Sequence, residues 1–198
     1  MRLPRLALLS LALTSLPTAA FAHTGVGATN GFAHGFMHPM GGLDHVLAMV
    51  AVGLLAARLG GRALWLVPSS FVTMMILGGI AGASGFGLPL VELGISGSVL
   101  VLGFVIALGR GLPIALAMAL VGFFGIFHGH AHGTEMPVDA QSFPYGAGFV
   151  LATMLLHAAG LALGMGADRL AGSWSAKASR VAGATMAAAG AGIMAGAF

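Results

Sequence analysis

Long apolar stretches separated by short polar or glycine-rich linkers dominate the sequence after residue 38. Each stretch is close to the roughly 20 residues that a helix needs to cross a bilayer. Because backbone groups in lipid must find hydrogen-bond partners within their own segment, the stretches are predicted to be α-helices. Six such helices are expected, over residues 39–57, 63–82, 89–109, 112–129, 145–166 and 178–197.

The first 22 residues have the pattern of a removable signal peptide. Two arginines precede the apolar run LALLSLALTSL, and the letters AFA at residues 20–22 match a cleavage site. An uncleaved first membrane helix is the alternative, but a run of about 11 apolar residues is short for a span. The predicted organisation is a signal peptide over residues 1–22 and a six-helix transmembrane domain over residues 23–198. Residues 23–38 are too short and too rich in glycine to form a further span.

Composition supports the membrane assignment. The chain has 198 residues, of which 58% are hydrophobic and only 7% charged, and its mean hydropathy is +1.00. A soluble domain carries about 25% charged residues, so the chain is predicted to be an all-α integral membrane protein. The absence of cysteine excludes disulfides and thiolate metal sites. A net charge of only +3 does not indicate a nucleic-acid-binding surface.

The basic residues predict how the helices are oriented. If the mature N-terminus lies outside the cytoplasm, the linkers after the first, third and fifth helices are cytoplasmic. All basic residues after the predicted cleavage site fall in these three linkers or in the first turn of the sixth helix that follows the third of them, as the positive-inside rule requires. They are Arg58, Arg62, Arg110, Arg169, Lys177 and Arg180. Both termini of the mature chain are therefore predicted to lie outside.

Small residues predict how the helices pack. The chain contains 33 glycines, and membrane helices approach each other closely through glycine and alanine. The last segment spaces Gly183, Ala187, Ala191 and Ala195 four residues apart, which predicts a packing stripe.

Ionisable residues gather at the predicted outer ends of three helices. Placing such groups in a membrane costs free energy, which indicates a function. Imidazole and carboxylate without thiolate suit Ni²⁺, Co²⁺, Zn²⁺ or Mn²⁺, and ligand type does not choose among them. Helix capping is the alternative for the carboxylates. The residues are His38, Asp44 and His45 in the first helix, Glu92 in the third, and His128, His130, His132 and Glu135 in the fourth.

Helical spacing sorts the residues of the fourth helix. His128, His132 and Glu135 are related by four and then three positions, so they are predicted to share one face, while His130 points elsewhere. His130 is therefore expected to be a structural residue.

Spacing poses a problem at the first helix. His38 and His45 lie seven residues apart, which is about 10 Å along a continuous helix. One ion reaches both only if the helix start is irregular. The Gly41-Gly42 pair makes a break plausible, because glycine tolerates the dihedral angles that a break requires.

Three further histidines stand apart from these groups. His157 is predicted to lie near the midplane, either hydrogen-bonded to a neighbouring helix or acting as a relay point below the outer cluster. His23 would begin the mature chain, where its imidazole and free α-amine can chelate a divalent ion. The alternative is that His23 simply follows the cleavage site. A structural role is the simpler reading of His34.

Two motifs in the chain resemble the signatures of a known family. HPMGGLDH, at residues 38–45, is similar to the HPxxGxDH signature of the HupE/UreJ nickel permeases, and FHGHAHGTE, at residues 127–135, is similar to their FHGxAHGxE signature. The resemblance covers essentially the whole mature chain. It implies transport of Ni²⁺ or Co²⁺ across the bacterial inner membrane for maturation of hydrogenase or urease.

The resemblance also implies which residues transport requires. His130 falls on the variable position of the second motif, and His128 is a motif member of less certain role. Phe71 and Glu92 also match family positions. The residues implied to be required are His38, Asp44, His45, His132 and Glu135.

Two functions from different classes compete at this point. The leading hypothesis is a permease whose transported substrate is Ni²⁺, with Co²⁺ or Zn²⁺ left open. The alternative is an intramembrane zinc-dependent hydrolase in which Glu135 acts as general base on metal-bound water. The chain has no HExxH motif to favour the hydrolase and no GxxxxGK[ST] loop to indicate ATP coupling. The predicted partners are a divalent ion and membrane lipid, not nucleic acid, and homo-oligomer formation stays open.

Overall fold

The computed structural model describes residues 31–136, 142–171 and 175–197, and the regular elements in this part of the chain are all helices. The predicted signal peptide, its cleavage site and His23 lie outside the described residues. The described helices are α2 (Gly31–Gly41), α3 (Leu43–Leu59), α4 (Ala63–Ala83), α5 (Val91–Leu108), α6 (Ile114–Thr134), α7 (Ser142–Ala171) and α8 (Ser175–Met194).

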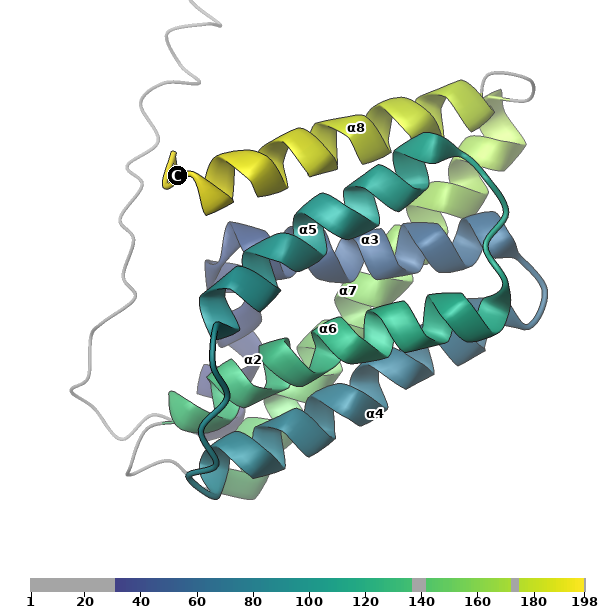
Figure 1. Ribbon diagram of the computed structural model, residues 1–198. Coiled ribbons are helices and arrows are strands. Elements are labelled where there is room, and N and C mark those ends of the chain that lie inside the picture. The colour runs from purple at the N-terminus through teal and green to yellow at the C-terminus, as the bar shows by residue number, and fades with distance from the viewer. Residues whose placement is uncertain (1–30, 137–141, 172–174, 198) are drawn as a thin grey trace, which may run out of the picture.

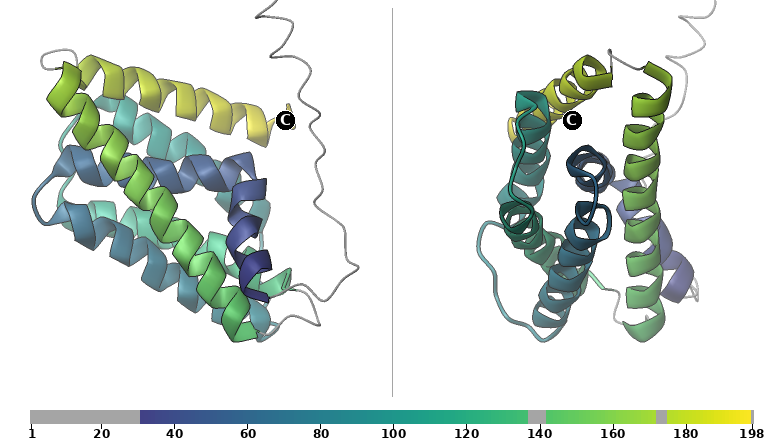
Figure 2. Two further views of the ribbon diagram at one scale, coloured as in Figure 1. Left: turned by 180° about the vertical axis from the view of Figure 1, so that it is seen from behind. Right: turned by 90° about the vertical axis from the view of Figure 1, so that its right-hand side faces the viewer.

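The helices from α3 to α8 form a bundle in which successive helices alternate in direction (Figure 1). Helices α4 and α6 lie side by side along their length, as do α5 and α8, and α3 runs between the two pairs. Helix α7 crosses behind them diagonally and packs on α2 and α3 (Figure 2). We call the end at which α3 begins and α6 ends the histidine end, and the opposite end the arginine end.

Within the described residues, four helices are long and apolar enough to cross a membrane, namely α4, α5, α6 and α7, and the bent pair of α2 and α3 gives a fifth candidate span. The chain is therefore a multi-pass membrane protein. Helix α8 occupies the last predicted segment but is not among these candidates. Its sequence is rich in alanine and glycine and carries Lys177 and Arg180 near its start, which lowers its apolar character.

The surface of the bundle is apolar, as lipid requires. Phe104 on α5, Phe123 on α6 and Leu163 on α7 are 56%, 54% and 60% exposed. Large apolar side chains exposed over several helices are rare on soluble monomers. The outward faces of these helices therefore fit contact with lipid chains.

The prediction for the first segment is wrong about where helical structure begins. It was expected as a single helix over 39–57 after an irregular stretch, but residues 31–38 are helical and belong to α2. The chain then bends by 84° between α2 and α3. The sequence of this segment is rich in glycine and polar residues and did not indicate a helix; in the structure the helix packs on α7.

Glycines bring α4 and α6 into backbone contact. A Cβ atom built on Gly129 of α6 would meet the carbonyl oxygen of Met75, and one on Gly82 of α4 would meet that of His130. Helices α5 and α8 approach in the same way, since a Cβ on Gly183 would lie 2.7 Å from the Gly103 carbonyl oxygen. The packing role predicted for the stripe in the last segment is confirmed at Gly183.

Gly129→Val is expected to destabilise the fold, because any side chain at this position overlaps the Met75 backbone. Overpacking of this kind costs about 1–3 kcal/mol or more. The measurement is thermal unfolding of the protein in detergent. The matched control is Gly97→Val, since nothing lies within 4 Å of a Cβ built on Gly97. Equal melting temperatures for the two variants would contradict the close α4–α6 contact.

Two arginines cap the C-terminus of α5 at the arginine end. Arg58 Nη1 donates to the Ile106 carbonyl oxygen at 3.4 Å. Arg180 donates from Nε to Ala107 and from Nη2 to Leu108, at 3.1 and 3.4 Å. Positive charge near unpaired carbonyls at a helix C-terminus is stabilising. These arginines therefore tie α3, α5 and α8 together in addition to any part they play in orientation.

Candidate functional site

A sharp bend at Gly42 builds the first part of the site. Gly42 is extended, with φ −107° and ψ 123°, and joins α2 to α3. The bend places the imidazoles of His38 and His45 against His132 of α6, each at a ring-centroid distance of 4.7 Å. The irregular helix start that would let both histidines reach one ion is therefore confirmed. A Cβ on Gly42 would lie 2.6 Å from Asp44 Oδ1, so a side chain at this position would displace the Asp44 carboxylate.

Four imidazoles from three helices form a continuous row, which we call the imidazole file. Its members in order are His38 of α2, His132 of α6, His45 of α3 and His128 of α6. Consecutive rings have centroid distances of 4.7 Å and stand nearly perpendicular to each other. The file runs inward, since the His38 side chain is 30% exposed whereas His132 is 3% and His128 0% exposed. The shared face predicted for His128 and His132 is confirmed.

Carboxylates fix the orientation of the two histidines supplied by the first motif. Asp44 Oδ1 lies 2.9 Å from Nδ1 of His45 and accepts the His45 backbone N–H at 2.7 Å. Glu135 Oε2 lies 3.2 Å from Nε2 of His38. A carboxylate on one ring nitrogen sets the tautomer and leaves the other nitrogen with a lone pair, as in many metal sites. Both carboxylates thus prepare an imidazole to bind a cation.

The nitrogens left over along the file have no hydrogen-bond partner. His45 Nε2, His128 Nδ1 and both ring nitrogens of His132 are buried without a partner among the described residues. His128 Nε2 is used, at 3.0 Å from Ser98 Oγ. Buried polar atoms are nearly always hydrogen-bonded, so a run of unpaired imidazole nitrogens indicates a ligand that binds to lone pairs.

Glu92 lies beside the file rather than in it. This residue is exposed in the first turn of α5 and shares a cavity of about 220 Å³ with Asp44 and Ser96. The end of α8 closes the cavity with Ile193 and Met194. The cavity therefore has a carboxylate from each of two helices, and Asp44 connects it to His45.

His130 faces away from the file, as its spacing predicts. Its Nε2 lies 2.6 Å from the carbonyl oxygen of Phe86, in the linker between α4 and α5. This contact joins the end of α6 to a loop. The structural role expected for His130 is supported by this geometry.

His157 lies beyond His128, the inner end of the imidazole file. It is 2% exposed, and neither ring nitrogen has a hydrogen-bond partner among the described residues. The hydrogen bond to a neighbouring helix, which was one reading of His157, is therefore not present there. The Phe71 ring separates His157 from His128, with centroid distances of 5.1 and 5.6 Å to the two histidines.

Helix α7 contributes a row of buried side chains beside the imidazole file that the sequence did not predict. Tyr145, Phe149 and Thr153 precede His157 at four-residue intervals, and all four are 5% exposed or less. Tyr145 contacts His34 and His38, extending the path outward, and Phe149 contacts His132. The repeated interval of four was the available signal, but aromatic residues in a membrane helix rarely point to function by themselves.

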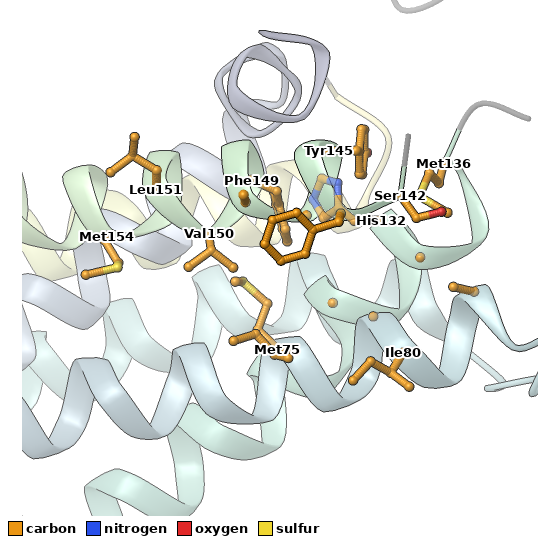
Figure 3. A pocket seen from close by; sticks show the side chains of 18 residues that line it. Met75, Ile80, His132, Met136, Ser142, Tyr145, Phe149, Val150, Leu151 and Met154 are labelled. Atoms are coloured by element: carbon orange, nitrogen blue, oxygen red, sulfur yellow. The ribbon is translucent and has the colours of Figure 1, made fainter. Parts of the chain in front are cut away.

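An apolar cavity lies to one side of the file. It measures about 560 Å³ and lies between α4, α6 and α7, where His132, Tyr145 and Phe149 border it (Figure 3). The remaining lining is mostly methionine, isoleucine, valine and glycine. A divalent cation would find few partners in this cavity, because His132 and Tyr145 are among its few polar side chains.

No group of three or more His, Asp or Glu side chains within the described ranges is arranged to hold a metal ion. The donor atoms follow one another along the file rather than surrounding one point. Such an arrangement offers an ion several partial sites in sequence. Transport requires binding that is weak or spread over several positions so that the ion can leave.

Fold and site together define a multi-pass helical membrane protein with a buried row of imidazoles leading in from a carboxylate-bearing end. The sequence profile of the HupE / UreJ protein family matches residues 11–193. A curated relative, Protein HupE of Rhizobium leguminosarum bv. viciae, is 44% identical over 187 residues, which cover 94% of this chain and 96% of the relative. The chain therefore belongs to the HupE/UreJ family. No solved structure matches it significantly.

Family membership confirms the resemblance inferred from the two motifs. Members of the family are transporter-like accessory proteins associated with nickel for hydrogenase and urease, not enzymes. The zinc-dependent hydrolase is therefore not supported.

Proposed function

We propose that this protein is a permease of the bacterial inner membrane that carries Ni²⁺, or the similar ion Co²⁺, into the cytoplasm for hydrogenase or urease maturation. The observation that carries the proposal is the imidazole file, with its unpaired nitrogens and the carboxylates behind His38 and His45. Imidazole is a good ligand for nickel, cobalt and zinc, so the donor set supports this class of ion without choosing a member.

Carboxylates act first in the proposed path. Asp44 and Glu92, facing one cavity of about 220 Å³, offset the charge of an arriving divalent ion. A water molecule occupies about 30 Å³ in the liquid, so the cavity is large enough for an ion with several of its waters. The ion then exchanges water for imidazole nitrogen at His45 and passes along the file toward His128.

The orientation of the permease follows from the charged ends of the bundle. The basic residues of α3, α4, α5 and α8 lie at the arginine end, which we assign to the cytoplasm by the positive-inside rule. The histidine end then faces the periplasm. On this assignment α8 is the sixth span and both termini are periplasmic, as the sequence predicted.

Uptake by proteoliposomes tests the function directly. Purified protein reconstituted with a metal-sensitive dye inside the vesicles is expected to accumulate Ni²⁺ or Co²⁺ faster than protein-free vesicles. A panel of Ni²⁺, Co²⁺, Zn²⁺, Mn²⁺ and Mg²⁺ identifies the substrate, and Mg²⁺ is expected to be excluded because it prefers oxygen ligands. Vesicles that admit none of the transition metals would contradict the proposal.

Uptake is expected to fall as the pH on the histidine side is lowered from about 7.5 to about 5.5, because an imidazole binds a metal ion only in its neutral form. A protonated ring has no lone pair for a metal ion. The loss should therefore reverse when the pH is restored. The measurement is the initial uptake rate across this range at fixed free metal. A flat profile would mean that carboxylates alone capture the ion.

His23 has an auxiliary role in this proposal. Its α-amine and imidazole would chelate an ion before it reaches the cavity and raise the local metal concentration. Because capture matters only when metal is scarce, His23→Ala is expected to slow uptake at low metal and leave the maximal rate unchanged.

A further inference from the structure

The file of metal-binding side chains is interrupted at a single point. His128 ends the file on one side, His157 lies on the other, and the ring of Phe71 stands between them at centroid distances of 5.6 and 5.1 Å. The Phe71 side chain comes from α4, whereas His128 and His157 belong to α6 and α7. Three helices therefore meet at this ring.

The Phe71 ring is buried and contacts both His128 and His157 in this conformation. No part of Phe71 is exposed, and the same holds nearly completely for Met75, one turn along α4, and for Thr153, one turn before His157 on α7, which are 1% and 0% exposed. These neighbours contact each other, since Thr153 Oγ1 donates to Met75 Sδ at 3.6 Å. A phenyl ring has no lone pair to replace water around a divalent ion. An ion at His128 therefore advances only if the Phe71 side chain moves.

His157 offers the ion a possible ligand on the far side of Phe71. Both of its nitrogens are buried without a hydrogen-bond partner among the described residues, although buried polar atoms are normally paired. Thr153 lies one turn away on the same face of α7, and its hydroxyl oxygen keeps lone pairs while its proton is donated to Met75. The nitrogen and oxygen atoms at this level suit a divalent transition metal ion.

We propose that Phe71 is a gate that separates the imidazole file from an inner metal-binding station formed by His157 with Thr153. This inference rests on the proposed function and adds to it the point at which the path is closed. His157 has no carboxylate partner among the described residues, unlike His45, so the ion's charge is less fully offset at the inner station than beside Asp44. Weaker binding at the inner station favours release toward the arginine end.

Binding kinetics of Co²⁺ to the purified full chain in detergent test the gate. Stopped-flow absorbance is expected to show a fast phase, as the file fills, and a slow phase that waits for Phe71 to move. Phe71→Leu shortens the side chain and keeps it apolar, so the slow phase should become about tenfold faster. The matched control is Phe123→Leu, since Phe123 is 54% exposed on the lipid face of α6. An unchanged slow phase in Phe71→Leu would overturn the gate.

Variants of His157 test the inner station. His157→Leu is expected to remove the slow phase and one bound equivalent of Co²⁺ while the fast phase remains. His157→Cys is expected to restore both, because a thiolate is a metal ligand. The chain has no other cysteine, so a sulfur-to-cobalt absorption band would report binding at this position alone.

Different results would contradict the inner metal-binding station and the proposed permease function. Wild-type protein that takes up metal but shows one phase and the same stoichiometry as His157→Leu would overturn the inner station and leave the permease intact. Wild-type protein that neither binds nor transports any metal of the panel would overturn the proposed function itself.

Discussion

Asp44→Asn is expected to reduce metal uptake at low external metal by about 10- to 100-fold, the range seen when a carboxylate behind a metal-binding histidine is lost. Asparagine keeps the size of the side chain but removes its charge from the cavity that Asp44 shares with Glu92. Its amide also stabilises the Nδ1–H tautomer of His45 less strongly than a carboxylate 2.9 Å away does. The ion would thus lose both charge compensation and a prepared ligand.

The measurement for Asp44→Asn is initial uptake over a range of metal concentrations, with the amount of protein in the membrane determined in parallel. Ser96→Ala is a suitable control, because Ser96 lines the same cavity but carries no charge. Its hydroxyl donates to the Glu92 carbonyl oxygen within the helix, so its removal should change uptake little. Wild-type uptake by Asp44→Asn would reduce Asp44 to a helix-capping residue.

His132→Ala is expected to lower uptake by about 100-fold or to abolish it. His132 is the ring through which His38 and His45 are connected, at 4.7 Å from each. Both of its nitrogens are buried without a partner among the described residues. Alanine at this position removes the imidazole that lies beside His45, so an ion that reaches His45 loses one of the ligands that would replace its water.

His130→Ala separates the transport role from a structural one. The two histidines are two residues apart and similarly buried, at 5% and 3% exposure, but His130 contacts the Phe86 carbonyl rather than the file. Losing that hydrogen bond should cost about 1 kcal/mol of stability and leave most of the uptake. The measurement pairs uptake with thermal unfolding for each variant. Similar uptake by both variants would contradict the assignment of His132 alone to the file.

Several features of the site could be predicted from the sequence because they depend on helix periodicity or on the cost of burying polarity. The face shared by His128 and His132, and the departure of His130 from it, follow from the angle between successive residues of a helix. Clustering of histidines and carboxylates at one end follows from the alternation of helix direction. The need for a break near Gly42 followed from the distance between His38 and His45 on a continuous helix.

Other features depended on which helices are neighbours, and spacing along one chain carries no such information. The sequence placed Glu92 in one cluster with the histidines, whereas the packing of α3, α5 and α8 puts it in a separate cavity with Asp44. The contribution of Tyr145 and Phe149 became visible only when α7 was found to cross the path. The pairing of Asp44 with His45 and of Glu135 with His38 likewise required coordinates.

By itself, the sequence determined the membrane-embedded helical class, the family and most of the residues that bear on metal, because apolar length, charge distribution and two long motifs are local properties. Only the tertiary structure decided the order in which those residues meet. The 84° bend between α2 and α3 and the glycine contacts between α4 and α6 bring imidazoles from three helices into one file. Close packing of the helices also leaves the ring of Phe71, which contacts His128 and His157, with no exposed surface.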